Sequence, residues 1–290
     1  MNDFWPADLV QELSQRRGIV FLGAGASASC TSDAGVRQPG WVDLLDQLAV
    51  SLTTADKAAF QDAIGKSRLL DAAQIVVDNV TPPLLNVALT RIFANSTIRP
   101  SALYESLNLI DQPVVMTTNY DRMYERFWEI LVNASGDEPM DSLVVRNYTD
   151  TDVVDYLRSD RRLLLKLHGS IEKPNDLVLS RSQYSRAKYE QANYFRIVSA
   201  LMLTRTMLFV GCGFNGDPDI DLLLEDSAFT AQSTAPHYAL VARGRHSSEI
   251  RSLKSAFNIT LLEYDNVAGD HAEMLIQLNS LASLVDSNRP

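Results

Sequence analysis

Six short apolar segments restrict the fold of this chain more than any other feature. They are Ile19–Leu22, Pro113–Thr118, Leu163–Leu167, Met207–Val210, Tyr238–Ala242 and Ile259–Tyr264. Each is nearly continuous in apolar residues, which is typical of strands buried on both faces of a parallel sheet covered by helices. Helical patterns lie between them. The alternation predicts an open, parallel-sheet α/β fold of the Rossmann-like type.

One long region departs from this alternation. From Trp41 to about Asn108 the pattern is helical and contains no convincing strand. We therefore expect residues 41–110 to form a helical insertion or cap on the sheet. No internal repeat or flexible linker interrupts the 290 residues, so the sequence predicts a single nucleotide-binding type of domain over 1–290.

The first motif, Gly23-Ala24-Gly25-Ala26-Ser27, directly follows the first predicted strand. Glycines at such a turn allow the backbone to approach a pyrophosphate, which backbone N–H groups then hold. A tight turn without a ligand is an equally good reading of the motif alone. The usual dinucleotide fingerprint is incomplete because position 28 is Ala, and no Gly-Lys-Ser/Thr follows that would indicate a P-loop.

Three further motifs follow predicted strands, where ligands of open α/β sheets bind. They are Thr117-Thr118-Asn119-Tyr120-Asp121, His168-Gly169-Ser170, and Gly211-Cys212-Gly213-Phe214 with Asp217-Pro218-Asp219. Each has a purely structural alternative. Asn119 or Asp121 could cap a helix beginning at Tyr120, His168 could be a structural side chain rather than a general base, and Asp217 with Pro218 would begin another helix.

Together, the order, spacing and residue types of these four motifs resemble those of the sirtuin (SIR2-like) superfamily. The resemblance extends from about Gly18 to Asp265. The Thr118-Asn119-Tyr120-Asp121 form and the ending after Gly211 are similar to the bacterial sirtuin-like effectors of antiphage defence that destroy NAD⁺. Protein deacetylases of the superfamily differ from this chain in two ways.

The first difference is a four-cysteine zinc module, which Cys30 and Cys212 cannot supply because they are the only two cysteines. The second is a stretch ending in Asp-Phe-Arg, which is replaced here by residues 35–41, Gly-Val-Arg-Gln-Pro-Gly-Trp. Both differences argue against binding of an acyl-lysine peptide, and we expect no zinc.

The resemblance implies cleavage of the bond between nicotinamide and ribose, with NAD⁺ as substrate and nicotinamide and ADP-ribose as products. Asn119 would hold the ribose or the attacking water, and His168 would act as the base. The remaining expected contacts to NAD⁺ are Gly23, Ala24, Gly25, Ala26, Ser27, Thr118, Asp121, Gly211, Gly213 and Phe214. Gly213 stands where relatives commonly carry Ser, so a hydroxyl contact from that position is not expected.

Two other functions fit the same residues. The fold could be a sensor that binds NAD⁺ or ADP-ribose without turnover, although such a module needs neither Asn119 nor His168. It could also transfer ADP-ribose to a macromolecule or remove an acyl group, and the absent zinc module argues only against deacylation.

Charge and the absence of leader or membrane segments restrict the partners. The chain has 26 Lys+Arg against 36 Asp+Glu, a net charge of −10, which argues against direct nucleic-acid binding. No signal peptide or membrane-spanning run is visible, so a cytoplasmic protein is expected. An enzyme that destroys NAD⁺ needs restraint, and the residues after Asp265 suffice for one helix. We therefore expect a homo-oligomer, a separately encoded regulatory subunit, or both.

Overall fold

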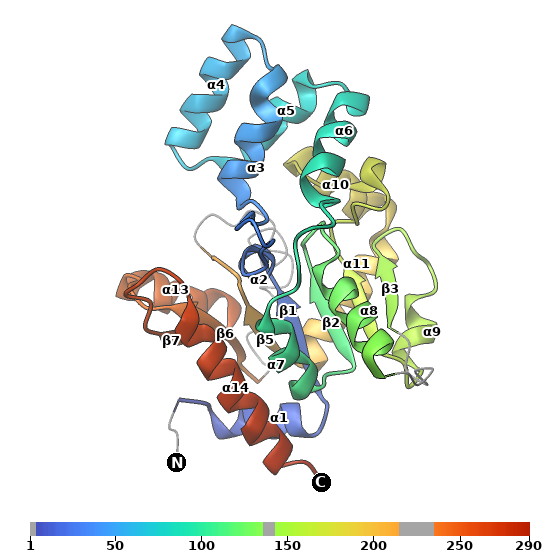
Figure 1. The fold of residues 1–290 in the computed structure, drawn as a ribbon, viewed down its shortest axis with the longest axis vertical. Helices are drawn as coiled ribbons and strands as arrows, with labels where there is room; N and C mark the ends of the chain where they lie inside the picture. Colours follow the sequence, from blue (N-terminus) through green and yellow to red (C-terminus); the bar gives the residue numbers. More distant parts are fainter. Residues whose placement is uncertain (1–3, 136–142, 215–234) are drawn as a thin grey trace.

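A seven-stranded sheet forms the centre of the computed structural model, which describes residues 4–135, 143–214 and 235–290. Its strand order is β3-β4-β2-β1-β5-β6-β7, and every neighbouring pair is parallel. The prediction of an open parallel α/β sheet is confirmed. Parallel neighbours require crossover connections, and helices supply them on both faces (Figure 1).

All six predicted strands are present, within one or two residues of their expected ends. The strands are β1 (Gly18–Leu22), β2 (Val114–Thr117), β3 (Val144–Asn147), β4 (Leu163–Lys166), β5 (Thr206–Val210), β6 (His237–Ala242) and β7 (Ile259–Tyr264). The sequence prediction missed β3. This strand occupies an edge of the sheet, and of its four residues only Val144 is buried, so it lacks the long apolar run that revealed the others.

Helices cover the sheet and extend beyond it. They are α1 (Ala7–Ser14), α2 (Ala24–Ala28), α3 (Trp41–Leu48), α4 (Thr54–Gly65), α5 (Leu69–Asn79), α6 (Pro82–Phe93), α7 (Ala102–Ile110), α8 (Met123–Ser135), α9 (Val153–Leu157), α10 (Arg181–Glu190), α11 (Ala192–Thr204), α13 (Ser247–Phe257) and α14 (Ala272–Ser287). None of the helices in the described ranges is both long enough and apolar enough to cross a membrane.

Alternation along β1 distributes its side chains between two cores. Val20 and Leu22 pack with α1, α7, α8 and α14 on one face of the sheet. Ile19 and Phe21 pack with α10, α11 and α13 on the other face. Successive side chains of a strand point to opposite faces, so a strand that is apolar at every position is held between two layers of helices. β1 is therefore fixed from both sides, and the loop that follows it starts from a rigid position.

Between β1 and β2 the described chain is helical, as the sequence predicted for most of 41–110. Helices α3 to α6 bury a separate apolar cluster that includes Leu45, Phe60 and Leu89, and they extend away from the sheet at the top of Figure 1. The helix α7 instead packs against α14 on one face of the sheet. Whether the chain is one domain with an insertion over 41–110 stays a prediction.

A buried histidine makes the stability of the sheet depend on pH. His237 begins β6, is 2% exposed, and accepts a hydrogen bond at Nδ1 from the Met207 N–H, 3.2 Å away. Burial lowers the pKa of His237 to about 4, from 6.5. The neutral form is therefore the one that folding favours. Its contribution is complete above about pH 6.5 and is lost as the pH falls toward 4.

We predict that His237→Asn reduces this acid sensitivity, because the Asn oxygen can replace Nδ1 as acceptor and does not titrate. The shift corresponds to about 3 kcal/mol between neutral pH and pH 4. Urea unfolding of both proteins should be compared at pH 7.5 and pH 5. The native protein should lose more stability than the variant, and equal losses would contradict the prediction.

Candidate functional site

The four sequence motifs meet at one edge of the sheet. They follow β4, β2, β1 and β5, which are consecutive in the sheet and parallel. Their carboxyl ends therefore lie side by side. The chain leaves β1 toward β2 on one side and reaches β5 on the other, and a reversal of this kind leaves a crevice where ligands of open α/β folds bind.

The loop after β1 packs directly on the loop after β5. The Gly23 N–H donates to the Val210 carbonyl at 3.0 Å, and the Gly25 N–H donates to the Gly211 carbonyl at 2.8 Å. A Cβ at Gly23 would lie 2.6 Å from the Gly211 oxygen, and one at Gly25 would lie 2.8 Å from it. Packing against the backbone of the loop after β5 therefore requires glycine at both positions, and the sequence alone did not predict this contact.

Asn119 is held by hydrogen bonds to two acceptors in the loop after β1. Its Nδ2 donates to the Gly23 carbonyl at 2.8 Å and to the Ser27 hydroxyl at 2.9 Å. A backbone carbonyl can only accept, so the amide orientation is determined. Among the described residues nothing donates to Oδ1 of Asn119, and the residue lines a cavity. The carboxamide therefore presents a fixed acceptor to whatever occupies that cavity.

Asp121 has the capping role that the sequence left open. Its Oδ1 accepts a hydrogen bond from the Met123 N–H at 2.9 Å, at the start of α8. The helix begins at Met123 rather than at the expected Tyr120. The reason is that Tyr120 is part of the preceding loop, where its hydroxyl donates to the Val178 carbonyl at 2.7 Å. Asp121 also lines the cavity beside Asn119.

A buried ion pair connects the second and third motifs. Lys166, the last residue of β4, is 1% exposed and lies 3.0 Å from the carboxylate of Glu125 on α8. Its Nζ also donates to the carbonyl of Asp121. The loop of Asn119 is thereby attached to β4. A charge buried this deeply is tolerated only with such partners.

His168 lies two residues beyond Lys166 and is itself 1% exposed. Its ring packs edge-on against Tyr184, with ring centroids 5.7 Å apart, and its carbonyl accepts a hydrogen bond from the Val178 N–H. It is not among the described residues that line the two cavities at this edge of the sheet. The structure thus brings Asn119 to a cavity and covers His168, whose role as base stays a prediction.

The larger cavity has a volume of about 980 Å³, at the upper end of the range for ligand pockets. It begins at Ala24 and Gly25, passes Gly211 and Gly213, and reaches the ends of β6 and β7. A Cβ at Gly213 would meet nothing within 4 Å, so this position is open. Phe214 is 7% exposed with its ring against Phe209, and it is not among the described residues that line this cavity.

Two other predicted contacts, Gly23 and Ala26, line neither cavity among the described residues. Ala26 is fully buried and lines neither cavity within the part of the chain that the structure describes, whereas Ser27 and Thr118 line the smaller one. The helix expected to begin at Asp217 and Pro218 lies outside the described residues.

Sequence reasoning missed the basic and aromatic residues that complete the larger cavity. Arg37, Arg243 and Arg245 contribute guanidinium groups, and Tyr264 and His271 contribute rings. The Tyr264 hydroxyl lies 2.7 Å from Nδ1 of His271. Arg37 is far in sequence from the other four, and only the strand order brings them together. Their guanidinium groups are suited to an anionic ligand such as a pyrophosphate.

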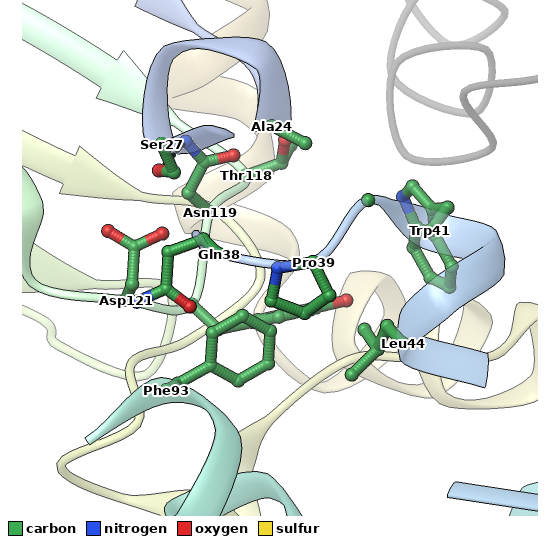
Figure 2. Close-up of a pocket in the computed structure, with 12 residues that line it drawn as sticks. Ala24, Ser27, Gln38, Pro39, Trp41, Leu44, Phe93, Thr118, Asn119 and Asp121 are labelled. Atoms are coloured by element: carbon green, nitrogen blue, oxygen red, sulfur yellow. Dashed lines mark hydrogen bonds between the residues drawn. The ribbon is translucent and has the colours of Figure 1, made fainter. Parts of the chain in front are cut away.

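The smaller cavity adjoins the larger one, since Ala24, Gly40 and Trp41 line both. Figure 2 shows Gln38, Pro39, Phe93 and Leu44 around it together with Asn119 and Asp121. Gln38 and Phe93 were not expected from sequence. No group of three or more His, Cys, Asp or Glu side chains in the described ranges could hold a metal ion.

Comparison with known proteins agrees with this geometry. A profile of the SIR2-like domain matches residues 113–262, from the residue before β2 into β7. Two relatives are named NAD(+) hydrolase ThsA. The one from Bacillus cereus (strain MSX-D12) is 23% identical over 81% of this chain and 45% of its own length. The one from Acinetobacter baumannii (strain 532279) is 24% identical over 93% of this chain and 51% of its own.

A third relative of the same name, from Enterococcus faecium, is 28% identical over 44% of this chain and 25% of its own length. The chain thus spans about half the length of the first two relatives. The profile match begins beyond the first glycine motif, so that motif is assigned here by its contacts with Asn119 and Gly211.

Removing one partner of the buried ion pair should destabilise both the fold and the site. We predict that Lys166→Met lowers the free energy of unfolding by about 3–5 kcal/mol, because it leaves the Glu125 carboxylate buried and unpaired. The double variant with Glu125→Leu should recover most of the loss, since no buried charge remains. Urea unfolding measures both.

The matched control is Lys66→Met, which breaks the exposed pair with Asp62 and should leave the unfolding midpoint almost unchanged. A double variant as unstable as Lys166→Met alone would show that the hydrogen bond to the Asp121 carbonyl, rather than the ion pair, dominates.

Proposed function

The chain belongs to the SIR2-like domain family, and from this premise we propose that it is an NAD⁺ hydrolase that releases nicotinamide and ADP-ribose. The observation that carries the proposal is the fixed carboxamide of Asn119, bonded to Gly23 and Ser27, which lines the smaller of two adjoining cavities. The relatives named NAD(+) hydrolase support it.

In this proposal NAD⁺ lies along the carboxyl ends of the strands. Its pyrophosphate would contact Ala24 and Gly25, with the adenosine portion in the larger cavity beside Gly211 and Gly213. The nicotinamide end would extend toward Asn119, Thr118 and Asp121. The proposed orientation of NAD⁺ follows from the sizes of the two cavities, because only the larger one has room for the bulk of a dinucleotide.

The reaction consumes one water molecule and releases one proton. The bond between the ribose C1′ and the pyridinium nitrogen breaks, its electron pair leaves with nicotinamide, and a water oxygen forms the new bond to C1′. The ribose carries developing positive charge, so catalysis consists chiefly of orientation and charge stabilisation. The Oδ1 of Asn119 would accept a hydrogen bond from a ribose hydroxyl or from the attacking water.

His168 is assigned the removal of the proton. Its ring is buried, so this role requires an activated form in which the ring reaches the ribose or water. The described form would then be a restrained one. We propose, with the resemblance as support, that the protein is a cytoplasmic antiphage effector that acts by NAD⁺ depletion. Oligomerisation or a separately encoded partner subunit would control this restraint.

Hydrolysis can be tested directly by incubating the purified protein with NAD⁺ and following nicotinamide by chromatography. Asn119→Ala should lower turnover by roughly 100-fold or more, because the oriented acceptor is lost. His168→Ala should do the same by removing the base. The matched control is Asn288→Ala, which alters an amide bonded to Leu284 near the C-terminus.

Turnover that both site variants retain would contradict the assignment. Labelled NAD⁺ that marks protein or nucleic acid would instead identify transfer of ADP-ribose to a macromolecule.

The oligomeric state provides an independent test of the proposed regulation. We predict that the protein at micromolar concentration forms a homo-oligomer, measured by size-exclusion chromatography with light scattering. A monomer across that range would exclude self-association as the means of activation and leave the partner subunit.

A further inference from the structure

Gln38 is a buried carboxamide whose hydrogen-bonding groups have no partner in the part of the chain that the structure describes. It is 4% exposed, and within the described residues neither its Oε1 nor its Nε2 has a hydrogen-bond partner. An unmet buried polar group costs about 1–3 kcal/mol, so such groups normally have a reason to exist. Gln38 lines the smaller cavity with Asn119, and Figure 2 shows its side chain among those that surround this space.

The loop that carries Gln38 is held in place on both sides. It runs between α2 and α3, and its turn is closed by hydrogen bonds from Gly35 N–H to the Ser32 carbonyl and from Ser32 N–H to the Val36 carbonyl, both at 2.9 Å. Thr31 forms bridges to Arg37 and to Arg99. The unmet amide is therefore presented by an ordered segment.

The rest of the lining identifies the kind of occupant. Phe93, Trp41, Pro39 and Leu44 give the cavity an apolar, partly aromatic wall, which suits a flat ring. This cavity measures only about 30 Å³, room for one or two water molecules. A small polar group attached to a ring would thus fit beside Gln38, while the ring itself would extend past Trp41 toward the adjoining larger cavity.

We propose that Gln38 recognises the carboxamide of the nicotinamide ring and selects for it. The inference rests on the proposed NAD⁺ hydrolysis, whose leaving group is an aromatic ring bearing a primary amide. Two primary amides are self-complementary, because each donates from its nitrogen and accepts at its oxygen. One such pair satisfies Oε1 and Nε2 of Gln38 together. Gln38 is then a specificity-determining residue.

The test compares binding of NAD⁺ with binding of 3-acetylpyridine adenine dinucleotide. This analogue keeps the carbonyl group on the pyridine ring and replaces the amide nitrogen by a methyl group. Calorimetry on protein carrying His168→Ala avoids turnover. With Gln38 present, NAD⁺ should bind at least ~10-fold more tightly than the ketone, because the ketone leaves Oε1 unmet. In Gln38→Met the preference should fall to nearly one, with weaker binding of NAD⁺.

A second variant separates recognition from a structural role. Gln38→Glu keeps an acceptor for the amide N–H₂ and loses the donor, so it should retain the preference for NAD⁺ while binding both ligands more weakly. Gln74→Met, a glutamine on α5 bonded to Asp78, is the matched control and should preserve the original preference. A change in stability alone would weaken both ligands equally in both Gln38 variants.

The outcomes distinguish this inference from the proposed function. A preference for NAD⁺ that Gln38→Met leaves unchanged, or no binding of NAD⁺ at all, overturns the inference. The expected pattern of preferences in a protein that releases no nicotinamide as an oligomer or with its partner subunit supports recognition by Gln38 and rejects hydrolysis. If the native protein hydrolyses NAD⁺ but Gln38→Met leaves the preference for NAD⁺ unchanged, the hydrolase assignment stands and Gln38 is not the residue that selects the substrate.

Discussion

The close backbone contact between the loops after β1 and β5 determines the geometry of the whole site. Gly25 N–H donates to the Gly211 carbonyl, and a Cβ at Gly211 would lie 2.2 Å from the Ala26 nitrogen. Gly211 also has φ of +70°, a conformation that glycine adopts without strain. Glycine at these positions is thus required by sterics whether or not a ligand is present. The contact joins the loops that follow two neighbouring strands, and residues of these loops line both cavities.

A few interactions hold the polar side chains of the site in place, and each joins a different pair of segments. Asn119 bonds to Gly23 and Ser27, which joins the loop after β2 to the loop after β1. Lys166 then joins the same loop to β4 through the Asp121 carbonyl and Glu125. Because the donors and acceptors are already oriented in the protein, a substrate meets them without the cost of arranging them.

The sequence predicts those elements whose structure follows from a local pattern, and it misses those that depend on a distant partner. Strands buried on both faces show in sequence as continuous apolar runs, so β1, β2 and β4 to β7 were found. The edge strand β3 has mixed polarity and was not. The start of α8 was misplaced because Tyr120 is held by a distant carbonyl, that of Val178. Local patterns contain no information on such a partner.

The same distinction applies to the site. Motifs at strand ends could be predicted, since parallel strands bring their carboxyl ends to one edge. The burial of His168 and the unmet amide of Gln38 could not, because both arise from packing between segments far apart in sequence. An isolated Gln in a loop carries no sequence signal at all. Its significance comes only from the absence of protein partners in the described structure and the cavity that it lines.

The helices α3 to α6 are joined to the site through Tyr120, the residue after Asn119. Tyr120 packs in the helical cluster, with its ring centroid 5.5 Å from that of Phe93 on α6. Its carbonyl accepts a hydrogen bond from Ile171 N–H in the loop after β4, three residues beyond His168. Movement of α6 would therefore act on the loops of both proposed catalytic residues. A contiguous contact of this kind transmits regulation only if it has two stable arrangements. The structure describes one arrangement, in which His168 is buried and the loops of Asn119 and His168 are joined through Tyr120.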